Sequence, residues 1–346
     1  MVSAEPLSVV FFGTPAFAAP TLQALLDSPH RVVGVVSQPD RPRGRGQKTG
    51  IAPVKELALA AGLPVLQPER LKDPGFLDAF VRLGADLGVV AAYGRLIPEV
   101  VINTPRLGLI NVHGSLLPRY RGAAPIHRAV MAGDTETGIT IMRIVKELDA
   151  GAMFAKAVRP IPFDATSADL EKDLATVGAR LLVEVVDAIA AGTAREEPQD
   201  HAQATYAPKI TRDESPIDWT RSAAALHNQV RGLTPWPHAS TSLDRVRLIV
   251  IRTVPELSAG TEVPAPHRLS SAPSLRSASR SPDVEPELQF RRPIPGTILE
   301  AAGDAIRVAT GDGVLRILEL QPEGKRAMTA REFLAGRPIA AGTQLT

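Results

Sequence analysis

The first 36 residues alternate between short apolar runs and a helical stretch. Leu7–Phe12 and Arg31–Val36 are rich in β-branched and aromatic residues, and each is short enough to be a fully buried strand. Between them, Phe17–Leu26 carries apolar residues at helical spacing, after a turn that contains Gly13. A strand, a turn, a helix and a second strand in this order open a doubly wound sheet. The N-terminal part of the chain is therefore predicted to be α/β, with a Rossmann-like, mostly parallel sheet.

This alternation of strands and helices continues to residue 191. Further strand-like runs are Asp86–Ala92, Leu109–His113, Gly138–Ile144 and Met153–Val158, of which the last two are expected to pair as a hairpin. Helical stretches are Val54–Ala61, Ile97–Ile102 and Ala124–Ala132. A long amphipathic segment to Ala191 follows the N-cap residue types in Asp164–Ser167. Residues 1–191 are therefore predicted to form one domain.

The pattern changes in the second part of the chain. Residues 192–213 lose the periodicity and are predicted to be a linker. In residues 214–346, the predicted strands are Leu243–Thr253, Gly296–Glu300, Ala305–Thr310 and Gly313–Leu320, and glycine-containing hairpin turns separate the last three. This favours a small, OB-like β-barrel. Residues 255–292 are rich in Ser, Pro and Ala, so we predict a poorly ordered insertion in a barrel loop.

Composition removes several kinds of chemistry. The chain has no cysteine, so disulfides, thiolate nucleophiles and Cys-ligated metals are excluded. Its histidines lack metal-ligand spacing, and we expect no metal. The turn Gly13-Thr14-Pro15 lacks the glycines of a dinucleotide fingerprint. There is no apolar span long enough for a membrane helix, so we expect a cytoplasmic protein with no membrane partner, and a monomer.

Three polar side chains stand out as candidates for chemistry. Asn111 and His113 end a predicted strand two residues apart, which places them on one face. Asp149 lies on the loop of the predicted hairpin, where a carboxylate near an imidazole would stabilise its charged form. An amide beside a cationic imidazole can stabilise an oxyanion, which favours direct acyl-type transfer. The alternative is a strand end whose polar groups only satisfy the backbone.

A segment after the second predicted strand concentrates positive charge. Arg41, Arg43, Arg45 and Lys48 stand among glycines and prolines with almost no apolar residues. This is typical of an exposed, mobile loop. The loop is either a solvated connector or an arm whose cations follow a nucleic-acid backbone. The net charge of +2 does not decide between these interpretations.

Asn111–Gly122 followed by Leu148–Gly151 resembles the signature of the 10-formyltetrahydrofolate-dependent formyltransferases. Within that family, the chain resembles the branch that acts on methionyl-tRNA. Further matching segments occur in the expected order along the chain, namely Phe12–Pro15, Gln38–Pro42, Gly122–Ile126, Asp218–Trp219, Pro235–Pro237 and Pro295–Ile298.

The resemblance implies a role for each matching position. The catalytic residues would be Asn111, His113 and Asp149. The folate-binding residues would be Ser115, Leu116, Leu117 and Pro118. The tRNA-binding residues would be Arg41, Arg43, Arg45 and Lys48. The formyl donor would be 10-formyltetrahydrofolate, the acceptor would be initiator methionyl-tRNA, and the C-terminal barrel would add RNA contacts.

Two other functions stay open at this point. A formyltransferase acting on a small amine, such as a glycinamide ribonucleotide or an amino-sugar nucleotide, would use the same three residues. It would have no need of the basic loop and the C-terminal β domain, and this favours tRNA. A non-catalytic RNA-binding module would use the loop and the barrel alone, but it would not need the three polar residues.

Overall fold

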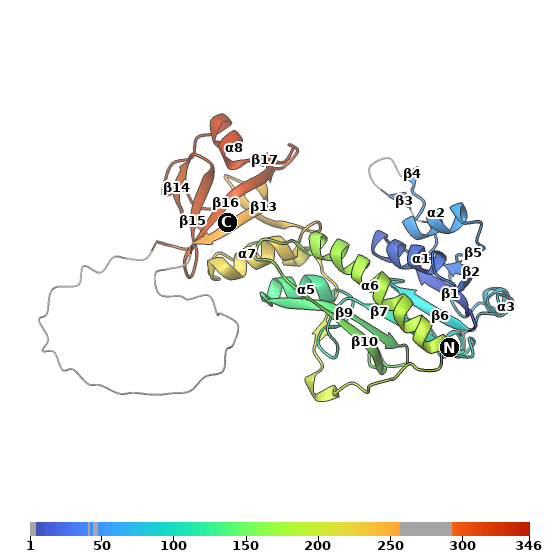
Figure 1. Cartoon of the computed structure of the whole chain (residues 1–346). Coiled ribbons are helices and arrows are strands. Elements are labelled where there is room, and N and C mark those ends of the chain that lie inside the picture. Colours follow the sequence, from blue (N-terminus) through green and yellow to red (C-terminus); the bar gives the residue numbers. More distant parts are fainter. Residues whose placement is uncertain (1–4, 41, 44–47, 257–292) are drawn as a thin grey trace, which may run out of the picture. The chain divides into compact units, whose positions relative to one another are not determined.

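The computed structural model describes residues 5–40, 42–43, 48–256 and 293–346. The chain forms two compact units, each described here by itself (Figure 1). The first unit comprises Met1–Ser215 and Arg231–Pro237, and the second comprises Pro216–Val230 and His238–Thr346. No helix in the described ranges is long and apolar enough to cross a membrane.

The first unit is built on a seven-stranded sheet in the order β10-β9-β7-β6-β1-β2-β5. Its strands are β1 (Ser8–Gly13), β2 (Arg31–Val36), β5 (Val65–Leu66), β6 (Leu87–Ala91), β7 (Leu109–His113), β9 (Glu136–Arg143) and β10 (Met153–Pro160). The five strands from β7 to β5 are parallel, while β9 runs antiparallel to both β7 and β10. The prediction of a doubly wound, mostly parallel sheet is confirmed.

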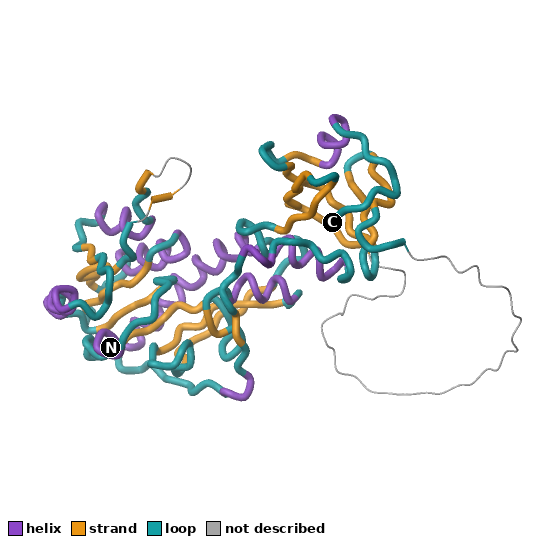
Figure 2. Tube along the Cα trace, turned by 180° about the vertical axis from the view of Figure 1, so that it is seen from behind, coloured by secondary structure: helices purple, strands orange, loops and turns teal. Residues whose placement is uncertain are grey.

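Helices cover both faces of this sheet because the central strands are apolar on both sides. In β1, Val9 and Phe11 pack into one core, while Val10 and Phe12 pack into a second core. The first core is closed by α1 (Ala19–Leu26), α2 (Pro53–Ala60), α5 (Pro125–Ala132) and α6 (Ser167–Ala190). The second core is closed by α3 (Pro74–Arg82) and α4 (Glu99–Ile102). Helices and strands of this unit can be followed from behind in Figure 2.

The long helix α6 begins where its N-cap chemistry predicts. The Thr166 hydroxyl accepts a hydrogen bond from the Asp169 amide, and the Asp169 carboxylate accepts one from the Thr166 amide. This reciprocal pair satisfies amide groups that the first helical turn leaves without a partner. The Thr166 hydroxyl also donates a hydrogen bond to the Asp169 carboxylate at 2.6 Å, and this bond, followed by the one from the Thr166 amide, holds the pKa of Asp169 below its usual value. The helix packs along β9, β10 and α1.

Residues 192–213, predicted as a linker, belong to the first unit. They contain η2 (His201–Gln203), β11 (Tyr206–Ala207) and most of η3 (Arg212–Glu214). The short strand β11 pairs in parallel with β8 (Arg121–Gly122), which follows β7 in the chain. This segment therefore packs against the residues that follow the Asn111/His113 strand.

The second unit is an antiparallel sheet in the order β12-β13-β16-β15-β14, with β17 paired to β16. Its strands are β12 (Ala239–Leu243), β13 (Val246–Glu256), β14 (Ile298–Ala302), β15 (Ala305–Ala309), β16 (Val314–Pro322) and β17 (Met328–Thr329). The two helices assigned wholly or largely to it are α7 (Ala223–Gly232), whose last two residues belong to the first unit, and α8 (Ala330–Gly336). The predicted hairpins β14–β15 and β15–β16 are confirmed. The predicted strand Leu243–Thr253 is instead divided between β12 and β13.

The end of the chain lies between the two outer strands of this sheet. Ser242 of β12 and Thr346 exchange two backbone hydrogen bonds, and the Leu345 amide donates to the Gly296 carbonyl before β14. The Ile298 amide of β14 donates to the Thr343 carbonyl. The C-terminal segment 343–346 therefore joins β12 to β14 through its backbone. The predicted insertion 255–292 lies outside the described residues, apart from its first two, which end β13.

Candidate active site

Asn111 and His113 lie on one face of β7, as the strand alternation predicts. Ile110 and Val112 point into the first core, whereas Leu109 points into the second. Asn111 and His113 therefore share the face of Leu109. His113 is buried and Asn111 is half-buried. Among the described residues, the Asn111 carboxamide makes no hydrogen bond within the protein.

The hydrogen bond of His113 to the backbone fixes its tautomer. Its Nε2 lies 2.9 Å from the Tyr120 carbonyl oxygen. A carbonyl only accepts, so Nε2 carries the hydrogen and Nδ1 of the neutral ring keeps its lone pair. That Nδ1 lies 3.8 Å from Oδ2 of Asp149. The free nitrogen of the ring, Nδ1, is therefore the one that faces Asp149.

Asp149 is brought to His113 by the loop between β9 and β10. Its backbone has a φ of 48°, in the left-handed region that a residue with a side chain rarely adopts. Its Oδ2 accepts a hydrogen bond of 2.8 Å from the Gly122 amide. The carboxylate is thus oriented by β8 and directed toward the imidazole. The structure brings His113 and Asp149 together, although they are far apart in the sequence.

Residues 120–122 contact both partners of this pair, because Tyr120 accepts from His113 and Gly122 donates to Asp149. Gly122 has a φ of 117°, and a Cβ there would lie 2.8 Å from the Ala207 carbonyl oxygen of β11. Only glycine allows this close approach of β8 to β11. The Tyr120 amide donates to the hydroxyl of Thr205, 2.8 Å away, so the residue that precedes β11 helps to fix Tyr120, whose carbonyl holds His113.

The side chain of Tyr120 is tied to Asp134. Its hydroxyl donates to the Asp134 carboxylate at 2.9 Å, and the Arg119 guanidinium donates to the same oxygen at 2.9 Å. Partial burial, followed by this hydrogen bond, raises the pKa of the Tyr120 hydroxyl. The phenol therefore stays protonated and keeps its donor role at neutral pH.

Two residues near Asp149, Gln199 and Arg121, have no predicted catalytic, folate-binding or tRNA-binding role. Gln199 donates hydrogen bonds to the backbone carbonyls of Asp149 and Gly151, and Arg121 donates to the Gln199 side chain. Both side chains are buried. Gln199 lies in the segment predicted as a linker. Only the pairing of β8 with β11 reveals its place, and no local motif marks it.

The turn Ser115–Pro118 follows β7, and its side chains divide into two groups. Ser115 is buried and donates to the Arg119 carbonyl at 2.7 Å. Leu117 is buried and packs with Met142 and Met153. Leu116 and Pro118 are half-exposed. The buried pair shapes the turn, so the accessible side chains of this predicted folate segment are those of Leu116 and Pro118.

Part of the predicted basic loop forms two short strands. β3 (Pro42–Arg43) and β4 (Lys48–Thr49) pair antiparallel, with Arg43 opposite Lys48. The sequence pattern predicts an exposed, mobile loop and no strand here; the backbone hydrogen bonds of a narrow hairpin can form without an apolar core, so no apolar pattern marks these strands. Arg41 and Arg45 lie outside the described residues.

A polar network holds the residues that flank this hairpin. The Lys55 ammonium of α2 donates to the Asp40 carboxylate and, at 2.6 Å, to the Gln67 side chain. Gln67 in turn donates to Asp40 and to the Gln38 carbonyl. The hydrogen bond from Lys55 lowers the pKa of Asp40, with a second contribution from Gln67. The start of the hairpin is therefore anchored to α2 and to the segment after β5.

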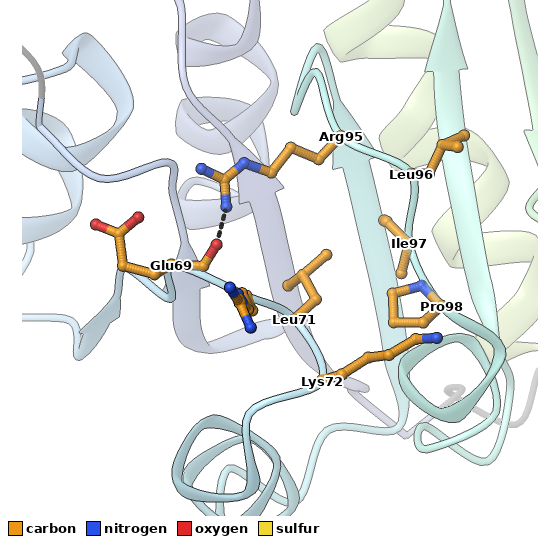
Figure 3. A pocket seen from close by; sticks show the side chains of 8 residues that line it. Glu69, Leu71, Lys72, Arg95, Leu96, Ile97 and Pro98 are labelled. Atoms are coloured by element: carbon orange, nitrogen blue, oxygen red, sulfur yellow. Dashed lines mark hydrogen bonds between the residues drawn. The ribbon is translucent and has the colours of Figure 1, made fainter.

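A hollow of about 570 Å³ lies between the segments that follow β5 and β6 (Figure 3). Its wall combines three cations, Arg70, Lys72 and Arg95, with a single carboxylate, Glu69. Arg95 donates to the carbonyls of Pro68 and Glu69, which ties the two segments together. The remaining lining residues are Leu71, Leu96, Ile97 and Pro98. Within the described residues, no group of three or more His, Asp or Glu side chains is arranged to hold a metal ion.

The sequence matches two known families along most of its length. Residues 7–186 match the family described as formyl transferase, and residues 209–338 match its C-terminal domain. This chain belongs to the formyl transferase family. Its three polar residues and the loops that orient them all lie in or next to the first matched segment.

Two relatives of this formyl transferase are similar over nearly the whole chain. A methionyl-tRNA formyltransferase of Methylococcus capsulatus is 45% identical over 96% of this chain and 98% of its own length. A methionyl-tRNA formyltransferase of Desulfotalea psychrophila is 42% identical over 99% of this chain and 96% of its own length. The similarity therefore includes the second unit as well as the first.

A solved structure shares the fold. The N-formyltransferase of Helicobacter canadensis, in complex with folinic acid and dTDP-3-aminofucose, aligns with a TM-score of 0.61 at 15% identity. The alignment covers 90% of this chain and 99% of that one. At this identity the likeness concerns the fold alone.

Proposed function

We propose that this formyl transferase moves a formyl group from 10-formyltetrahydrofolate to the α-amino group of methionine on initiator methionyl-tRNA. The observation that carries the proposal is the approach of His113 to Asp149, on the strand face that holds Asn111. The acceptor is supported by the 45% identity to a methionyl-tRNA formyltransferase over 96% of the chain.

The proposed catalytic residues are Asn111, His113 and Asp149. As the amine attacks the formyl carbon, a C–N bond forms and the formyl oxygen gains negative charge. The Asn111 amide and the protonated Nδ1 of His113 are the donors that stabilise this charge. The carbon–nitrogen bond to the folate then breaks, and the leaving nitrogen takes a proton from His113. Asp149 supports the charged imidazole and accepts the amine proton through water.

The formyl donor, 10-formyltetrahydrofolate, would bind at the turn Ser115–Pro118 and beside it. Leu116 and Pro118 offer apolar surface beside the proposed catalytic residues, and Ser115 and Leu117 hold the turn in shape. Folates carry carboxylates at one end. The three cations of the hollow between the β5 and β6 segments suit that end of the molecule.

The acceptor tRNA is assigned to the basic hairpin and the second unit. Arg41, Arg43, Arg45 and Lys48 would contact its phosphates, since arginine and lysine bind a nucleic-acid backbone without reading its sequence. We propose residues 1–191 as the catalytic domain and residues 214–346 as an OB-like barrel that adds RNA contacts. A barrel requires its sheet to close on itself, and the backbone hydrogen bonds that join residues 343–346 to β12 and to the start of β14 support this closure. We expect the protein to act as a monomer in the cytoplasm.

The assay that tests the proposal supplies 10-formyltetrahydrofolate together with charged initiator or elongator tRNA. Formylated methionine on initiator tRNA is the expected product. A glycinamide ribonucleotide and an amino-sugar nucleotide are offered in parallel, and formylation of either in place of methionyl-tRNA would support the small-amine alternative. Binding of tRNA without binding of folate would leave only an RNA-binding module.

Arg43→Ala is expected to raise KM for methionyl-tRNA while KM for the folate donor stays unchanged. The reason is the loss of one phosphate contact, which also reduces the salt slope of tRNA binding by about 1. The measurement is a salt titration of tRNA binding beside steady-state kinetics. Arg180→Ala, which removes an exposed arginine of α6, is the matched control. Equal tRNA affinity of the Arg43 variant and wild type at all salt concentrations would reduce the hairpin to a connector.

A further inference from the structure

We propose that Gln199 is a positioning residue that sets the turnover of this enzyme by holding the backbone of Asp149. The inference rests on the proposed function, because it assigns Gln199 a role through a proposed catalytic carboxylate. Gln199 is separated from Asp149 by β10 and α6 in the chain, and it makes no contact with His113 among the described hydrogen bonds.

The Gln199 amide nitrogen bridges two carbonyls of the Asp149 loop. It donates to the Asp149 carbonyl and to the Gly151 carbonyl, both at 2.8 Å. The primary amide has two N–H groups, so both are used on this loop. Gln199 is 5% exposed, so its amide is largely shielded from water. The loop is thus held at two points, on either side of Ala150.

Arg121 fixes the direction in which the Gln199 amide points. Its Nε and Nη2 donate to the Gln199 Oε1 at 3.1 and 2.7 Å. A guanidinium cannot accept a hydrogen bond, so the oxygen of the amide must face Arg121 and its nitrogen must face the loop. Arg121 is 4% exposed, and its Nη2 also lies 3.2 Å from Nδ1 of His201.

The position of Gln199 is also set by contacts outside the Asp149 loop. Glu197 and Met153 exchange two backbone hydrogen bonds of 2.8 and 2.9 Å, which fixes the segment before Gln199 against the start of β10. On the other side, Arg121 belongs to β8, which pairs with β11. Gln199 therefore transmits the position of two paired segments to a loop that lacks regular structure.

Asp149 needs such support at its backbone. Its φ of 48° is unfavourable for a residue with a Cβ and persists only when the surroundings hold it. The carboxylate end is held by the Gly122 amide and the backbone end by Gln199. Arg121 and Gly122 are consecutive residues of β8. This strand therefore holds the Asp149 carboxylate through Gly122 and the Asp149 backbone through Arg121 and Gln199. A shift of β8 would move the carboxylate and its backbone together.

Glutamine, rather than glutamate, at position 199 supports a role in holding the Asp149 loop. A buried guanidinium is better compensated by a carboxylate than by a neutral amide. A glutamate at position 199 would pair with Arg121, but it would place oxygens against the two loop carbonyls. Only an amide both accepts from Arg121 and donates to the loop. Gln199 therefore accepts from the buried Arg121 guanidinium and also donates to the Asp149 loop.

The test is Gln199→Glu, which keeps the partner of Arg121 and removes both donors to the loop. Displacement of Asp149 is expected to lower kcat about 10²-fold. We expect KM for the folate and for methionyl-tRNA to stay unchanged, and thermal unfolding is measured to establish that the variant is folded at the assay temperature. Gln203→Glu is the matched control, because Gln203 is exposed and bonds only the Asp200 carboxylate. Wild-type kcat in the Gln199→Glu enzyme would overturn the inference.

The same substitution in an Asp149→Ala background separates positioning from general structural damage. If Gln199 acts through Asp149, the second substitution causes no further loss of kcat. A full, multiplicative loss in that background would instead contradict the inference. If the Gln199→Glu enzyme does not fold, Gln199→Met takes its place, because methionine is similar in volume and also lacks the donors. The same loss of kcat is expected for it, with no further loss in the Asp149→Ala background. A wild-type enzyme that formylates no methionyl-tRNA would contradict the proposed function and is distinguishable from both outcomes.

Discussion

Asn111→Ala is expected to lower kcat for formyl transfer about 10²–10³-fold, which is the usual effect of removing one oxyanion donor. Asn111 is half-buried on β7, and its carboxamide has no hydrogen-bond partner among the described residues. The loss therefore leaves no buried protein group unpaired, so the Tm should change little. Both KM values should stay near wild type, since the donor acts on charge that appears only in the transition state.

The control for this prediction is Asn103→Ala, which removes the exposed asparagine at the end of α4. Single-turnover formylation with saturating folate and methionyl-tRNA measures the chemical step directly. An Asn111 variant with wild-type single-turnover rate would remove the amide from the mechanism. The oxyanion would then depend on His113 alone, and the assignment of the β7 face would fail.

The fold could be predicted where one local pattern determines an element. Short apolar runs predicted the buried strands, and the N-cap residue types in Asp164–Ser167 predicted the start of α6, where Thr166 is the N-cap residue. No helix or strand is predicted from the sequence between Ala61 and Asp86. The structure has α3 there, in which Phe76 and Phe80 lie at helical spacing after Pro74. That signal was present in the sequence and was missed.

The turn that separates β12 from β13 shows a physical limit of sequence patterns. Asp244 and Arg245 both have positive φ, 49° and 66°, without a glycine to mark the turn. The Asp244 carboxylate accepts from Arg337 at 2.7 Å, and Arg337 follows α8 much later in the chain. A contact that distant has no local signature. The strand was therefore predicted as continuous through the turn.

The site was predictable to a similar degree. Strand alternation places Asn111 and His113 on one face, and this needs no other element. The approach of Asp149 depends on how the β9–β10 loop folds back, which alternation does not determine. The supporting group, Gln199, depends on the pairing of β8 with β11, two strands of two residues each. Such short strands have no periodicity from which pairing can be inferred.

Gly151→Ala is expected to be the most damaging single-methyl change near the site. A Cβ at Gly151 would lie 2.0 Å from the Arg143 carbonyl oxygen, and its three nearest atoms are all Arg143 backbone, so no flexible side chain could move aside. The Gly151 carbonyl is also one of the two that Gln199 holds. The loop must therefore shift, and overpacking of this kind costs about 1–3 kcal/mol of the free energy of unfolding. Because Asp149 moves with the loop, kcat should fall about 10²-fold.

The control for Gly151 is Gly75→Ala at the start of α3, where an added Cβ meets no atom within 4 Å. That change should raise the free energy of unfolding by about 0.4–1 kcal/mol, because alanine restricts the unfolded chain. Thermal unfolding and kcat are measured for both variants. A Gly151 variant with the stability and kcat of wild type would mean that the loop tolerates displacement without moving the carboxylate. Asp149 would then be positioned by its Gly122 hydrogen bond alone, and the backbone hold attributed to Gln199 would have no consequence for turnover.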